Sequence, residues 1–119
     1  MHFKIIIVMS STRIAKVERL VQKELSEVLH RIQTDQFYGS IIGVTVVRIS
    51  PDFSLAKVYL SLFPHEKADQ IFSYLNDEKK QIRFKLGQRI GKQMRIVPEL
   101  AFYIDDSLDY MERIDKLLK

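Results

Sequence analysis

Between positions 12 and 33, apolar residues recur at steps of three and four, the spacing that places side chains on one face of an α-helix. This face consists of Ile14, Val17, Val21, Leu25, Val28, Leu29 and Ile32. Ser11 or Thr12 stands just before the pattern and can cap the free N–H groups of a first turn. The sequence therefore predicts an amphipathic helix over residues 12–33.

After a loop that contains Gly39 and Gly43, the apolar period changes to two. Two β-rich runs follow, the first with Val44, Val46, Val47 and Ile49 and the second with Ala56, Val58, Leu60 and Leu62. The residues between them, Pro51-Asp52-Phe53-Ser54, favour a turn, because proline presets φ and aspartate can bond the backbone ahead of it. Together these segments predict a β-hairpin.

Pro64 begins a helical stretch that has two separate apolar faces. The first face is formed by Ile71, Phe72 and Leu75, and the second by Ile82, Leu86 and Ile90. Because no apolar stripe joins the two faces, we expect two helices with a break within residues 76–80.

A third strand is predicted over residues 95–105, with Leu100, Phe102 and Ile104 on one side. Pro98 lacks an N–H group, which favours a sheet edge or a bulge. A short terminal helix is predicted from Leu108, Met111, Ile114 and Leu117, with Ser107 as its cap. The order α-β-β-α-α-β predicts an α+β domain whose helices cover one face of a three-stranded sheet.

The chain is predicted to hold one domain, residues 11–119, which is near the usual size for a single core. Residues 1–10 are predicted to be a short N-terminal extension. Two interpretations of it stay open: an extra β-strand, or non-native sequence ahead of a start at Met9, and the second is favoured. No signal peptide or run of ~20 apolar residues occurs. A cytoplasmic location is therefore expected.

Charge is distributed unevenly along this chain. The formal net charge is +4, and the sequence contains no cysteine, which excludes zinc ribbons and thiol catalysis. One segment carries seven basic residues against a single acid: Lys79, Lys80, Arg83, Lys85, Arg89, Lys92 and Arg95. A weaker basic stripe, diluted by glutamates, follows the first helix: Arg13, Lys16, Arg19 and Lys23. The segment favours nucleic acid as a partner. A solvated basic face and an acidic protein partner remain as alternatives.

Motifs of catalysis are missing from the sequence. His2, His30 and His65 lack the spacing of a metal-binding pair, and no nucleophile elbow or dinucleotide fingerprint occurs. The pair Asp105-Asp106 precedes a predicted helix, where carboxylates favour the N-terminus. We therefore expect a protein that is not an enzyme and that uses no cofactor, metal or small-molecule substrate.

Several motifs resemble those of one known family, the bacterial ribosome-binding factor A family. The resemblance rests on residues 82–90 (IRFKLGQRI), 94–100 (MRIVPEL) and 105–108 (DDSL). The segment from Arg48 to Tyr59 and the first helix from Arg13 to Leu29 fit the same family. The resemblance covers roughly residues 11–119.

This resemblance implies a type II KH-like fold and a factor that binds the free small (30S) ribosomal subunit and its 16S rRNA. It also implies assistance in late maturation, including processing of the rRNA 5′ end, and an association with growth in the cold. Two features depart from the pattern. The Gly-x-x-Gly loop of ordinary KH domains is missing, and Glu78-Lys79-Lys80 stands where family members often carry Ala-x-Gly.

The resulting hypothesis is a monomeric ribosome assembly factor whose partners are the small subunit and its rRNA, with no membrane partner. Phosphate contacts are expected first from Arg83, Lys85, Arg89, Lys92 and Arg95, next from Lys79 and Lys80, and last from the first-helix stripe. The alternative is a basic protein-interaction module that docks an acidic protein.

Overall fold

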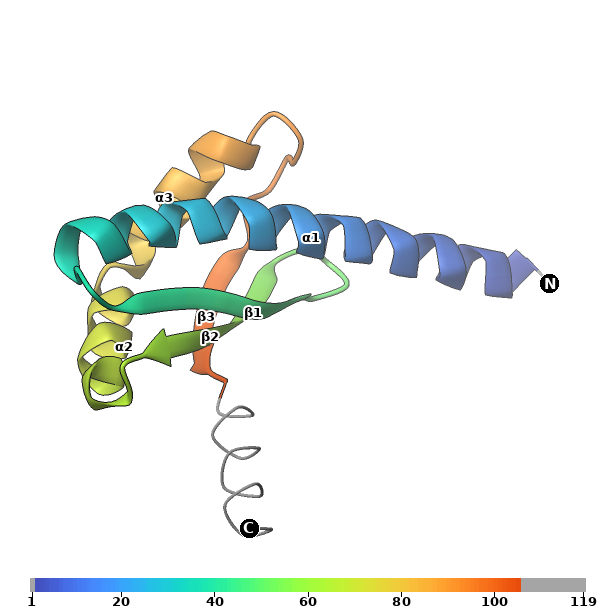
Figure 1. The fold of residues 1–119 in the computed structure, drawn as a ribbon. Helices are drawn as coiled ribbons and strands as arrows, with labels where there is room; N and C mark the ends of the chain where they lie inside the picture. Colours follow the sequence, from blue (N-terminus) through green and yellow to red (C-terminus); the bar gives the residue numbers. More distant parts are fainter. Residues whose placement is uncertain (1, 106–119) are drawn as a thin grey trace, which may run out of the picture.

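In this computed structural model, which describes residues 2–105, helices cover one face of a three-stranded sheet (Figure 1). The elements are α1 (His2–Gln36), β1 (Ile41–Ile49), β2 (Leu55–Phe63), the 3₁₀ turn η1 (His65–Lys67), α2 (Ala68–Asp77), α3 (Lys79–Ile90) and β3 (Glu99–Ile104). The predicted order and the α+β class are confirmed. The predicted terminal helix with Leu108, Met111, Ile114 and Leu117 lies outside the described residues.

The sheet has the order β1-β2-β3 and is mixed. β1 and β2 form the predicted antiparallel hairpin, whereas β2 and β3 are parallel, with Val58 opposite Phe102. A parallel pair needs a long crossover, which α2 and α3 supply. A bulge lies between Val44 and Val46, and it explains why the apolar alternation of β1 changes phase there.

The core lies between the helices and the inner face of the sheet. α1 contributes Val21, Leu25 and Leu29, which are fully buried. The two apolar faces predicted for the later helices are buried as well, except for the partly exposed Phe72. α1 runs alongside β1, and its first turns extend beyond the sheet (Figure 1). Among the described residues, no helix has the length and apolar character that a bilayer crossing requires.

The predicted break between α2 and α3 is confirmed. Glu78 alone separates the two helices, with φ −95° and ψ 13°. The reason is that the two apolar faces pack in different places: α2 contacts β2 and β3, whereas α3 contacts α1 and β3. A straight helix could not present both faces to these surfaces.

One prediction about the first helix is wrong, and the less favoured of the two interpretations of the N-terminal extension is excluded for its described part. α1 runs from His2 through Ser11 and Thr12, so the helix does not begin at either residue, and the described part of the N-terminal extension is not a strand. Extending an existing helix gains one backbone hydrogen bond for each residue that is ordered. A strand would need a sheet edge, and neither strand pairing of the sheet involves this segment.

The third strand is shorter than predicted, because β3 begins at Glu99 and not at Arg95. Residues 95–98 instead form a connection beside α3. Pro98 is buried immediately before the strand, and β3 lies at an edge of the sheet as expected. Arg83 binds the carbonyl groups of Val97 and Pro98, which directs the backbone here toward α3.

Candidate nucleic-acid interface

A groove of about 1050 Å³ lies between α3 and the connection that leads into β3. Four cations line it, Lys79, Lys80, Arg83 and Arg95, together with one carboxylate, Glu99. Gly87 forms part of its floor, and a Cβ added there would lie 3.2 Å from Cγ2 of Val97. The small residue at position 87 thus lets the connection approach α3 closely. We call this cavity the α3 groove.

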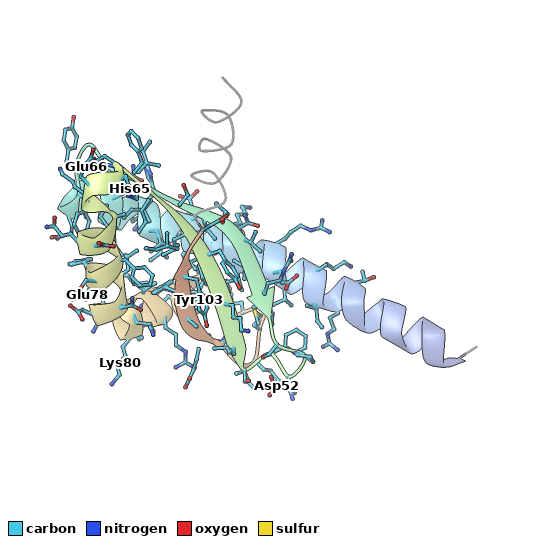
Figure 2. The ribbon with its side chains drawn as sticks, turned by 90° about the horizontal axis from the view of Figure 1, so that it is seen from below. Asp52, His65, Glu66, Glu78, Lys80 and Tyr103 are labelled. Carbon is cyan, nitrogen blue, oxygen red and sulfur yellow. The ribbon has the colours of Figure 1, made fainter. Side chains whose placement is uncertain are left out.

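The beginning of α3 adds to the positive character of the α3 groove. Lys79 and Lys80 are the first two residues of the helix, and no acidic residue lies in its first turn. The N-terminus of a helix also carries partial positive charge. Glu78 precedes it without making a side-chain cap, and Figure 2 shows Lys80 projecting away from the fold. This junction therefore presents two lysines at the beginning of α3.

Arg83 forms part of the groove wall and also holds that wall in place. Its Nε donates to the Pro98 carbonyl oxygen at 3.1 Å, and its Nη2 donates to the Val97 carbonyl oxygen at 2.7 Å. A guanidinium has five N–H donors. Its unused donors can still face an anion in the groove, so the proposed phosphate contact and the structural role are compatible.

The other three cations of the predicted basic segment do not line the α3 groove. Arg89 donates from Nε to Oε2 of Glu24 at 2.7 Å, which ties α3 to α1. Lys85 lies one turn before Arg89 and therefore on the same side of the helix. Lys92 follows α3 and is exposed. The single basic surface expected from the sequence is thus divided between two sides of α3.

The first-helix stripe is divided in the same way. Arg13 lines a smaller depression of about 340 Å³, and Arg95 and Ile96 line both this depression and the α3 groove. Lys16, Arg19 and Lys23 are exposed but line neither cavity. Arg95 and Ile96 therefore connect the α3 groove to the smaller depression, and Arg13 is the one cation of the first-helix stripe that lines either cavity.

The turn between β1 and β2 borders the smaller depression and is held by Asp52. Oδ1 of Asp52 accepts hydrogen bonds from the Ser50 hydroxyl at 2.7 Å, the Ser54 hydroxyl at 2.8 Å and the Ser54 N–H at 3.1 Å. These bonds, that of Ser50 above all, lower the pKa of Asp52 to about 2. The predicted bond from aspartate to the backbone ahead of it is confirmed. Within the described residues, no three potential metal ligands gather.

Two exposed apolar side chains in the α3 groove were missed by sequence reasoning. Phe84 is 63% exposed and Ile96 is 60% exposed, and both line the groove beside the cations. The sequence did indicate that Phe84 is exposed, because its position falls outside the apolar stripe of Ile82, Leu86 and Ile90. No comparable signal existed for Ile96, because its exposure depends on the path of the connection.

The order α-β-β-α-α-β, the mixed sheet and the helices on one face define a KH-like domain of type II. The α3 groove extends from the beginning of α3 and is lined by four cations.

Comparison with known proteins gives the family. The model of the family "Ribosome-binding factor A" matches residues 13–118, and the chain belongs to this family. Ribosome-binding factor A of Cytophaga hutchinsonii is 42% identical over 110 residues, which cover 92% of this chain and 83% of that protein.

Solved structures agree on the fold. The solution structure of a Thermotoga maritima protein described as a putative ribosome binding factor A has a TM-score of 0.62 at 29% identity, covering 76% of this chain and 85% of that one. A Thermus thermophilus ribosome binding factor A, a homology model fitted into a cryo-EM map of its 30S complex, has a TM-score of 0.54 at 24% identity. That match covers 78% of this chain and 91% of the other.

Proposed function

We propose that this protein binds the small (30S) ribosomal subunit during its assembly and contacts the 16S rRNA through the α3 groove. Membership of the ribosome-binding factor A family supports a ribosomal partner. The Thermus thermophilus relative, fitted into a map of its 30S complex, supports the small subunit in particular. The observation that carries the proposal is the gathering of Lys79, Lys80, Arg83 and Arg95 along one groove.

The groove acts by neutralising phosphates. Each lysine or arginine that meets a phosphate releases condensed counterions, so affinity falls as salt rises. About four such contacts on single-stranded RNA give a log–log slope near −3. Phosphate contacts position the protein but carry no sequence information. Selection of the immature subunit therefore comes from the shape of its rRNA.

The bound protein assists late maturation of the subunit, including processing of the rRNA 5′ end, and supports growth in the cold. It does so in the cytoplasm as a monomer, by binding and without catalysing a reaction. The basic groove supports this account because it offers a surface for RNA.

A pull-down from cell lysate, with and without ribonuclease, tests the proposal. The tagged protein is expected to recover 16S rRNA and small-subunit proteins, and both are expected to be lost after digestion. If a complex with an acidic protein survives ribonuclease digestion, that result would contradict rRNA binding and favour a protein-interaction module. Primer extension on rRNA from a depleted strain tests the finer claim, with unprocessed 5′ ends as the expected result.

A further inference from the structure

We propose that Phe84 stacks on an unpaired base of the bound RNA, so that the α3 groove selects single-stranded or looped RNA over duplex. This inference rests on the proposed function and names the kind of RNA that the groove accepts. It concerns an aromatic side chain in the groove, whereas the affinity proposed above comes from cations.

The position of Phe84 on α3 explains why its ring is available. Ile82, Leu86 and Ile90 form the buried stripe of the helix. At 3.6 residues a turn, Phe84 lies about 200° from Ile82, on the opposite side. Phe84 is 63% exposed, whereas Phe37, Phe53 and Phe72 pack against the core. The ring therefore contributes little to the core and remains free to bind a ligand.

The side chains around Phe84 are complementary to the phosphates and bases of a single strand of RNA. Lys79, Lys80 and Arg83 line the same groove and can follow a phosphate backbone. Ile96 supplies a second exposed apolar side chain in the lining. A basic groove with an aromatic side chain is the combination that single-strand binders use, with the strand's backbone on the cations and a base on the ring.

Two alternatives fit these surroundings less well. In duplex RNA the base faces are stacked on one another and cannot reach a ring in the groove. An apolar protein partner would have to bury Lys79 and Lys80 beside Phe84, and lysine is depleted in the cores of protein interfaces. An unpaired base can stack on the ring of Phe84 while the neighbouring phosphates contact the cations.

Affinity for two short RNA probes tests the proposal: an unstructured single strand and a blunt duplex of equal length. Phe84→Ala is expected to weaken single-strand binding about tenfold, within a range of roughly five- to one-hundredfold. Duplex binding should change less than twofold. Phe84→Trp should restore single-strand binding, because it keeps an aromatic face. The salt slope of Phe84→Ala should equal that of the wild type, since no phosphate contact is lost.

Control variants separate stacking from a loss of fold and from a general loss of exposed aromatic surface. Tyr38→Ala removes an aromatic side chain that is 88% exposed and lies outside the α3 groove, so it should leave binding unchanged. Circular dichroism and thermal unfolding show whether each variant is folded. If Phe84→Ala does not fold, that result would contradict the exposed position outside the core on which the proposal rests. The affinity of Phe84→Trp for the single strand would then show whether an aromatic ring at this position contributes to binding.

Each further outcome has a distinct meaning. If folded Phe84→Ala binds single strands as tightly as the wild type, stacking is overturned and the rRNA-binding function stands. Equal losses on single strand and duplex would also overturn stacking. If the wild type binds neither RNA probe yet still binds purified small subunits, stacking on an unpaired base is overturned, while the proposed binding to the small subunit stands.

Discussion

Arg83 and Arg89 hold the fold together as well as adding to the basic surface. Arg83 fixes the connection before β3 through two backbone carbonyl groups, and Arg89 binds Glu24 on α1. Both are among the phosphate contacts that the sequence predicts first. Arg95 differs from them, because no hydrogen bond or ion pair joins it to another described residue. The three arginines should therefore respond differently to substitution.

Arg83→Ala is expected to lower the free energy of unfolding by about 1 kcal/mol, because it removes two hydrogen bonds that are partly exposed to solvent. Arg95→Ala should leave stability within about 0.5 kcal/mol of the wild type, as is usual for exposed positions. Both variants should bind RNA less tightly. Urea denaturation of the pair, followed by circular dichroism, measures the difference. Equal stability of the two variants would show that the Arg83 bonds do not hold the groove wall.

Asp52 should titrate well below an ordinary aspartate. Its pKa is lowered to about 2 by the hydrogen bonds from Ser50 and Ser54. Because the folded pKa lies below the unfolded one, this stabilisation is present above the unfolded pKa and is lost as pH falls toward 2. An NMR titration of the side-chain carboxyl carbon measures it. Ser50→Ala should raise this pKa, and an ordinary pKa in the wild type would contradict the turn geometry.

At the scale of elements, the sequence predicted most of the fold because apolar periodicity reports which faces are buried. The stripes of α1 and α3 and the alternation in β2 were read directly, and the break near Glu78 followed from faces that do not align. The start of α1 was misplaced because the helix extends beyond the apolar stripe, and the other errors arose where position depends on partners distant in sequence. Arg95 was assigned to a strand, but Arg83 holds the backbone of residues 97 and 98 toward α3. The parallel pairing of β2 and β3 was also not predicted.

The pair of Arg89 and Glu24 offers a test of how α3 is held against α1. The two side chains are 32% and 19% exposed and lie 2.7 Å apart. A double-mutant cycle with Arg89→Gln and Glu24→Gln should give a coupling free energy of roughly 0.5–1 kcal/mol. That coupling should shrink at high salt, because partly exposed charges are screened. A coupling indistinguishable from zero would mean that apolar packing alone joins the two helices.

At the scale of the whole molecule, the fold determines which of the basic residues in the sequence lie together on one surface. Four cations of the predicted basic segment gather in the α3 groove, while Lys85, Arg89 and Lys92 lie outside it. Arg13, from the first-helix stripe that was expected to contribute last, lines the smaller depression together with Arg95. Charge density along the chain could identify the segment. It could not identify the groove, because helix rotation and the path of residues 91–98 decide which side chains face it.

The central claim is that the α3 groove carries binding to the small subunit, and sedimentation of lysate through a sucrose gradient tests it most directly. Two triple variants are compared with the wild type. One changes Lys79, Lys80 and Arg95 to Glu, and the matched control changes Lys16, Arg19 and Lys23 to Glu on α1. Both alter the net charge equally.

The wild type and the α1 control are expected to sediment with free small subunits and little with translating ribosomes, while the groove variant stays at the top of the gradient. Circular dichroism should confirm that the groove variant is folded, because Lys80 and Arg95 are exposed and Lys79 is only half-buried. Equal sedimentation of the groove variant and the wild type with free small subunits would contradict the account, and so would an equal share of wild type on polysomes.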